Sequence, residues 1–260
     1  AAGSLTCCCV DLSDFKLVHD NTWATDHTFD LQGEGSFRFL SPSWGDLPWS
    51  VNLTDSTFIY GKDGASTAFA HAGSIYFKTA SAKLRLERSV SVNAIKSDGG
   101  VASQVDLNGF VLTVRGAQSA VTYSGDIVGT GASGLSLYNI PLTFGHDLAF
   151  SGTLNLMNGD AFFGSAASPV SLAGQPALVA VAEGRANFYA DQTVKSLSGN
   201  GRESGVTIAS GKTFTAGVAG TTAVQTFAGR IDGEGGFAKD GAGYSLTMSG
   251  ANAYGGATRV

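Results

Sequence analysis

The sequence is poor in charge, proline and cysteine, and each scarcity excludes a class of protein. Charged residues make up 14% of its 260 positions and apolar residues 43%, the reverse of the balance that keeps a chain disordered. Only 5 residues are proline, which excludes a proline-rich linker or a collagen-like chain. The chain is therefore expected to fold around a hydrophobic core, as one elongated domain or two compact ones.

The three cysteines are consecutive, at Cys7, Cys8 and Cys9, and no other cysteine follows. This arrangement excludes a long-range disulfide framework and the CxxC spacing of zinc and redox sites. Neighbouring cysteines can join each other only through a strained ring. We interpret the cluster as part of an N-terminal tail, with a bond to another chain and a metal or lipid attachment as alternatives.

Clusters of basic residues and long apolar runs are also missing. The net charge is −5 and no run of Lys or Arg exceeds two residues, whereas nucleic acids and anionic membrane surfaces require a concentrated basic face. No apolar run approaches the roughly 18 residues of a membrane helix. Residues 1–10 lack the basic start and apolar run of a signal peptide, so the signal of an exported chain would already have been removed. We expect no nucleic-acid partner and no membrane insertion of this segment.

Glycine, by contrast, is abundant at 36 residues, and it separates short runs in which apolar and polar residues alternate. Tyr244, Leu246 and Met248 alternate with hydroxyl residues, the pattern of a strand with one buried face. Residues 81–88 are also interpreted as a strand, with Glu87 on its outer face. Further short strands are expected around Phe37, Val51, Phe58, Ile75, Val121, Leu148, Leu154, Leu172, Val194 and Ile208.

Internal repetition indicates how these strands are arranged. Residues 123–131 and 227–235 share the pattern aromatic, small, Gly, charged, Ile, any, Gly, any, Gly, and residues 31–37 echo part of it. Similar units, 105–114 and 206–215, precede the two clear copies. The copies are too far apart to be single coils, so shorter coils of about 20 to 30 residues are expected to stack between them. The sequence thus predicts an all-β fold, a β-solenoid whose coils bury one another.

The N-terminal fifth differs from the rest because it holds all three tryptophans, Trp23, Trp44 and Trp49. A solenoid needs an atypical end that covers its first coil. We therefore assign residues 1–60 to an N-terminal tail and cap, with an appended binding module as the alternative, and residues 61–260 to the solenoid repeats.

The clearest repeat lies at residues 206–260. Its last part reads Gly-Glu-Gly-Gly-Phe-Ala-Lys-Asp-Gly-Ala-Gly from Gly233, then Leu-Thr-Met-Ser-Gly-Ala-Asn-Ala-Tyr-Gly-Gly-Ala-Thr-Arg-Val from Leu246. This stretch resembles the autotransporter-associated β-strand repeat, also called the passenger-associated transport repeat, of bacterial autotransporter passenger domains. It departs from that pattern at Asp240, Tyr244 and Met248. The resemblance implies a right-handed parallel β-helix that is exported across the outer membrane by a C-terminal β-barrel. Asn252, in a glycine-rich turn, is expected to adopt a left-handed or Asx conformation.

Motifs for catalysis are scarce. The sequence has no GxSxG elbow and no HExxH motif, and residues 129–134 satisfy GxGxxG before a predicted strand where nucleotide binding requires a helix. Residues 205–213 miss the P-loop spacing by one position. The pairs His19-Asp20 and Asp26-His27 could suit a metal but are interpreted as a polar loop. His71 and His146 are interpreted as surface groups.

Right-handed β-helices include polysaccharide lyases, for which Glu34 and Glu234 are the best candidate carboxylates. Both lie in Gly-Glu-Gly turns, and we interpret them as solvated turn residues. The sequence therefore nominates no catalytic, cofactor-binding or metal-ligating residue, and no cofactor.

These observations favour a structural or adhesive β-helix passenger, a rod displayed outside the cell or on a bacterial surface. A polysaccharide-active β-helix lyase or hydrolase and a self-assembling extracellular fibre or matrix subunit are the alternatives. The partners expected are a host or neighbouring-cell surface, a polysaccharide, or a second copy of the chain.

Overall fold

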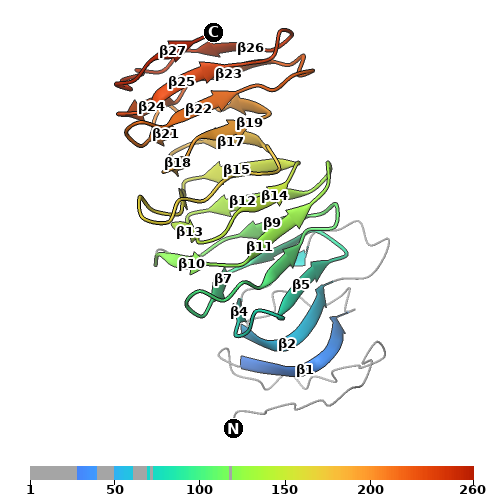
Figure 1. Cartoon of the computed structure of the whole chain (residues 1–260). Helices are drawn as coiled ribbons and strands as arrows, with labels where there is room; N and C mark the ends of the chain where they lie inside the picture. The colour runs from blue at the N-terminus through green and yellow to red at the C-terminus, as the bar shows by residue number, and fades with distance from the viewer. Residues whose placement is uncertain (1–27, 40–49, 61–68, 71–72, 117–118) are drawn as a thin grey trace.

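The computed structural model describes residues 28–39, 50–60, 69–70, 73–116 and 119–260, and these residues form strands and turns. The strands pair in parallel and stack as a β-solenoid of about nine turns, with β1 (Thr28–Phe39) and β27 (Thr258–Arg259) at opposite ends of the column (Figure 1). This architecture confirms the predicted all-β solenoid, while its right-handed sense stays a prediction. No helix in the described ranges is long and apolar enough to cross a membrane.

The strands lie on three faces of the column. Face one consists of β4 (Ser74–Phe77), β7 (Ala94–Ser97), β10 (Val121–Tyr123), β13 (Leu142–Phe144), β16 (Asp160–Phe163), β18 (Arg185–Phe188), β21 (Gly205–Ile208) and β24 (Arg230–Gly233). Face two consists of β5 (Lys83–Leu86), β8 (Gln104–Asp106), β11 (Asp126–Gly129), β14 (Leu148–Phe150), β19 (Gln192–Val194), β22 (Thr213–Ala216), β25 (Gly236–Lys239) and β27 (Thr258–Arg259). Face three consists of β3 (Phe69–Ala70), β6 (Val90–Val92), β9 (Val111–Val114), β12 (Gly134–Tyr138), β15 (Thr153–Met157), β17 (Ala177–Val181), β20 (Ser196–Ser198), β23 (Val224–Phe227) and β26 (Ser245–Met248).

Two long strands begin the stack. β2 (Ser50–Tyr60) belongs to faces one and two at once, because its first part pairs with β4 and its second part with β5. β1 (Thr28–Phe39) pairs in parallel along β2 with one register shift. The parallel sheet therefore reaches into residues 1–60, while the division of the chain into a cap and a solenoid stays a prediction.

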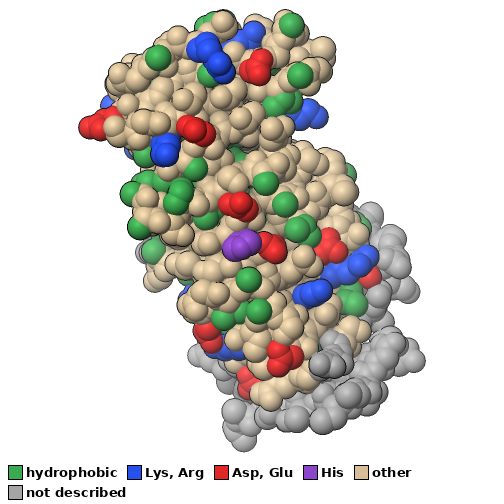
Figure 2. Space-filling view, in the orientation of Figure 1, with side chains coloured by type: hydrophobic (Ala, Val, Ile, Leu, Met, Phe, Trp, Pro, Cys, Tyr) green, Lys and Arg blue, Asp and Glu red, His purple; other side chains and the backbone are tan. Residues whose placement is uncertain are grey.

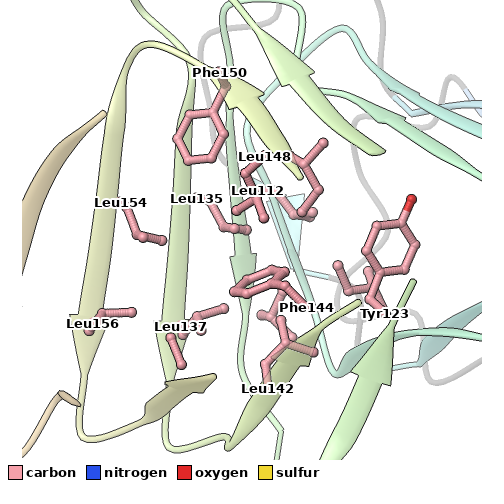
Figure 3. Close-up of a cluster of buried hydrophobic side chains, with 14 of the residues drawn as sticks. Leu112, Tyr123, Leu135, Leu137, Leu142, Phe144, Leu148, Phe150, Leu154 and Leu156 are labelled. Carbon is pink, nitrogen blue, oxygen red and sulfur yellow. The ribbon is translucent and has the colours of Figure 1, made fainter. Parts of the chain in front are cut away.

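Coil length and alternation follow the sequence pattern closely. From β4 onward, successive face-one strands begin 18 to 27 residues apart, close to the predicted coil of about 20 to 30 residues. Within β15, Leu154 and Leu156 are fully buried between residues that face outward. Figure 3 shows leucines from β9, β12 and β15 pointing into the same interior as Phe144 and Phe150. The core is thus one continuous column of apolar side chains.

Part of this column is a ladder of aromatic rings. Phe144, Phe163, Phe188 and Phe214 stack in sequence with ring centroids 5.3, 4.7 and 5.2 Å apart. Phe237 and Tyr254 continue it at 6.2 and 6.1 Å with tilted rings. Each such pair adds about 0.5–1.5 kcal/mol beyond area burial. The ladder moves from the end of face-one strands to the start of face-two strands, so it follows the corner between those faces.

The two clear sequence repeats, residues 123–131 and 227–235, span equivalent corners that follow different faces. Tyr123 ends a face-one strand, whereas Phe227 ends a face-three strand. In both copies the glycine two residues later faces a buried serine of the preceding coil: a Cβ would lie 2.6 Å from the Oγ of Ser103 or 2.5 Å from that of Ser204. The repeating unit is therefore one strand and its corner, because any corner with this packing accepts the same residues.

The weaker repeat at residues 31–37 lies at the same kind of corner as the repeat at residues 227–235. Gly33 and Gly233 have φ of 102° and 96° and lie where the chain passes from face one to face two. Such φ values favour glycine, which has no Cβ. Both turns therefore depend on the same residue type.

Several local expectations were wrong. Glu87 is buried rather than outward, because the chain turns a corner between β5 and β6. Val51 and Phe58 belong to a single strand, and Leu172 lies in a segment without a named strand. Asn252 is not among the residues with positive φ; its side-chain oxygen instead accepts a hydrogen bond from the backbone N–H of Ile231, 2.9 Å away in the coil below.

Candidate functional site

The corner that leads from face three to face one, which we call the three-one corner, lengthens along the column. Ser136, Asn155, Val179 and Ser198 are in register on face three, and Leu142, Ala161, Ala186 and Val206 are in register on face one. The segments that connect them are 137–141, 156–160, 180–185 and 199–205. The third and fourth segments are longer by one and two residues, so these corners carry extra backbone at a fixed strand register.

Side chains at this corner fall into three columns because the strands are in register. The first column, immediately before the face-one strand core, contains Pro141, Asp160, Arg185 and Gly205. The middle column is turned inward or lacks a side chain, and it contains Ile140, Gly159, Gly184 and Ser204, all buried. The last column contains Asn139, Asn158, Glu183 and Glu203, all exposed. Two outward columns therefore flank a middle column that projects nothing outward.

Glycine is required at two positions of the middle column, 159 and 184, because the coils approach closely there. A Cβ on Gly159 would lie 2.8 Å from the carbonyl oxygen of Ile140, and a Cβ on Gly184 would lie 2.2 Å from that of Leu156. Contacts this short would force the backbone to shift. The floor between the outward columns is therefore formed by backbone at these positions.

The result is an open, polar groove of about 570 Å³. Its lining consists of Asn139, Pro141, Asn158, Gly159, Asp160, Glu183, Arg185 and Glu203. We refer to this set as the corner groove. The groove offers three carboxylates, two amides and one guanidinium, supplied by four successive coils.

Backbone hydrogen bonds fix the groove from below. The N–H of Arg185 donates to the carbonyl of Gly159 at 3.1 Å, and the N–H of Gly205 donates to that of Gly184 at 3.0 Å. The side-chain oxygen of Asn158 accepts from the N–H of Glu183 at 3.2 Å. This hydrogen bond holds the Asn158 side chain in one orientation, so its NH₂ group is held in position at the groove.

The surroundings of Asp160 alter its acidity. Burial raises the pKa of its carboxyl group, and the charge of Arg185 partly opposes that rise. Asp160 and Arg185 are register partners on adjacent strands. The groove thus holds a partly desolvated carboxylate beside a cation, an arrangement suited to hydrogen bonding with a polar ligand.

The residues that the sequence analysis weighed, where the structure describes them, do not line this groove. Glu234 is exposed between β24 and β25. His146 is also exposed, as predicted, and its Nδ1 lies 2.5 Å from Oδ1 of Asp126. The Gly129–Gly134 motif is followed by strand β12, as predicted. The side chain of Glu34 lies outside the described part of the chain, as do all of Cys7, Cys8, Cys9, His19, Asp20, Trp23, Asp26, His27, Trp44, Trp49 and His71.

Sequence reasoning missed the groove residues because they are far apart in sequence. The signal available was the recurrence of polar-Gly-charged triplets, Asn-Gly-Asp at 158–160 and Glu-Gly-Arg at 183–185. These triplets become informative only once the coils are aligned. Among the described residues, no three His, Cys, Asp or Glu side chains are grouped so as to hold a metal ion.

Comparisons of this chain with protein-family models, curated proteins and solved structures found no match.

Proposed function

We propose that this chain is a structural and adhesive rod, a β-helix passenger displayed on a bacterial surface. The observation that carries the proposal is the parallel stacking of coils from β1 to β27 along one axis. Each coil is held by its neighbours above and below, so the column keeps a fixed length and fixed faces. A rod of this kind functions by geometry: it places side chains at defined distances from its base.

The surface of the rod suits a protein that is exposed to water on all sides. Figure 2 shows positive and negative side chains interspersed on the visible face, without a single-sign field. The large apolar residues that are exposed in the described ranges are Val224 and Val260. Such a surface stays soluble while it presents polar columns to solvent.

The resemblance over residues 206–260 supports display by the autotransporter route, and residues that carry it have defined roles in the coils. Gly233 takes the positive φ of its turn, and Phe237 lies in the aromatic ladder. Asn252 binds the coil below through its side chain. The motif therefore encodes a stackable coil, which is what a long passenger rod requires.

Surface labelling tests the proposal directly. Antibodies raised against the purified chain should label intact cells of the native host, and external protease should remove that signal without cell lysis. A periplasmic protein probed in the same cells is the control for membrane integrity. Labelling that appears only after permeabilisation would overturn the display of this rod.

A further inference from the structure

We infer that the corner groove binds an uncharged, hydroxyl-rich oligosaccharide that lies along the axis of the column. This inference adds a ligand-binding site to the proposed rod, and it does not require that the rod be displayed on a surface. It rests on the shape of the groove, on the kinds of polar group in its lining, on their balance of charge and on their fixed positions.

The shape of the groove favours a linear ligand. Its lining comes from four successive coils, and neighbouring strands in a sheet are about 4.8 Å apart, so the groove runs for roughly 14 Å along the axis. The outward columns form its two sides, and the glycine backbone at Gly159 and Gly184 forms its floor. A chain of sugar units extended along the column would contact both sides of the groove at its first three coils.

The lining chemistry favours hydroxyl groups. A hydroxyl both donates and accepts hydrogen bonds. Asp160, Glu183 and Glu203 supply acceptors, while Arg185 and the amides of Asn139 and Asn158 supply donors. The carboxylates, guanidinium and amides are planar groups that can bind two neighbouring hydroxyls at once. Charged partners also make such hydrogen bonds stronger than neutral ones do.

The charge balance selects against ionised sugars. Three carboxylates face one guanidinium in the lining, so a uronate or sulfated chain would meet like charge. A uniformly cationic chain would meet Arg185, which lies in register between Asp160 and Gly205 near the middle of the groove. An uncharged chain satisfies both kinds of group without placing like charges together.

The groove is also fixed before a ligand arrives. Its floor is held by hydrogen bonds between coils at Arg185, Glu183 and Gly205. The strands on either side are buried on their inner faces, with Leu156, Ala161 and Ala186 fully enclosed. The backbone of the groove therefore needs no reordering on binding, which suits a ligand held by a few hydrogen bonds.

Calorimetric titration of the purified chain tests the inference. The probes are four neutral hexasaccharides (cellohexaose, xylohexaose, mannohexaose and maltohexaose), one acidic hexamer of galacturonic acid and one cationic hexamer of glucosamine. At least one neutral probe should bind, and the acidic hexamer should not. Arg185→Ala and the double variant Glu183→Gln, Glu203→Gln should each weaken binding of that neutral probe by about tenfold, since each removes a charge-assisted hydrogen bond.

Two controls separate a site from a change in stability. Glu234→Gln makes the same chemical change at an exposed position on another corner and should leave binding unchanged. The melting temperatures of the groove variants should stay close to that of the parent chain, because Glu183, Arg185 and Glu203 are exposed. The inference is overturned if no neutral probe binds, if only the glucosamine hexamer binds, or if the groove variants bind as well as the parent. Any of these results would leave the surface-labelling test of the rod intact.

Discussion

Gln192 is a polar side chain buried in the core, and its role illustrates how single residues complete the column. Between β14 and β19, residues 170–172 take the place of a face-two strand but form no named strand. The Gln192 side chain accepts a hydrogen bond from the N–H of Leu172 at 2.8 Å and donates one to the carbonyl of Val170 at 2.6 Å. The side-chain amide thus makes the two bonds that a strand backbone would otherwise make there.

Replacing Gln192 by Leu should therefore destabilise the chain although the new residue is apolar. The substitution leaves a buried N–H and a buried carbonyl without partners, at a combined cost of about 3 kcal/mol. Urea unfolding followed by circular dichroism should show a lower midpoint. Thr193→Val, at the next residue on the outer side of the same strand, should change the midpoint little. An equal or higher midpoint for Gln192→Leu would contradict this role.

The raised pKa of Asp160 predicts how the stability of an Asp160 variant, relative to the parent chain, changes with pH. Burial raises its pKa in the folded chain above the value of 3.8 for an unperturbed aspartate, so the ionised group is less favourable folded than unfolded. This penalty is fully present above the folded pKa and disappears as the pH falls below 3.8. Asp160→Asn should therefore melt at the same temperature as the parent chain, or higher, at pH 7, with any advantage gone at pH 3. A variant that is less stable than the parent only at pH 7 would show that the contact with Arg185 outweighs desolvation.

At the scale of strands, the aromatic ladder joins consecutive coils. Phe188 stacks between Phe163 and Phe214 and is 1% exposed. Phe162 lies one strand away on the same face but points outward and is only half-buried. The two phenylalanines therefore have the same chemistry and opposite surroundings.

This contrast predicts that Phe188→Ala costs far more than Phe162→Ala. Truncation of a fully buried phenylalanine lowers the free energy of unfolding by about 3–5 kcal/mol, whereas the outward position loses only part of its contacts. Chemical unfolding of both variants provides the comparison. Equal losses would mean that the ladder adds nothing beyond ordinary surface packing.

Strands were predictable from sequence because their signal is local, whereas corners were not. Tyr244, Leu246 and Met248 alternate inward as their pattern predicted. Glu87 breaks the alternation because a corner follows β5, and the length of a corner is independent of strand register. The corner groove depends on that length: Glu183 and Glu203 lie on the longer segments. No local pattern shows which residues of different coils become neighbours, so the strands could be predicted and the groove could not.

At the scale of the whole molecule, coils contact mainly their neighbours, so damage should stay local. Leu154 in β15 is fully buried, with Leu135 on one side and Leu178 on the other. Leu246 in β26 is partly buried and is stacked on β23. An aspartate at either position places a charge against apolar side chains, and the cost of several kcal/mol for full burial applies to position 154.

Leu246→Asp should therefore fray the C-terminal coils first and leave residues 105–123 protected from protease. Leu154→Asp should instead open the middle of the column, because that coil supports neighbours on both sides. Limited proteolysis with mass spectrometry of the fragments distinguishes the two patterns. Coils that depend only on neighbours must fail in the order of their distance from the substitution. If Leu246→Asp makes all regions cleavable at the same rate, the chain unfolds as one cooperative unit, and the account of stability as a sum of neighbouring coils is wrong.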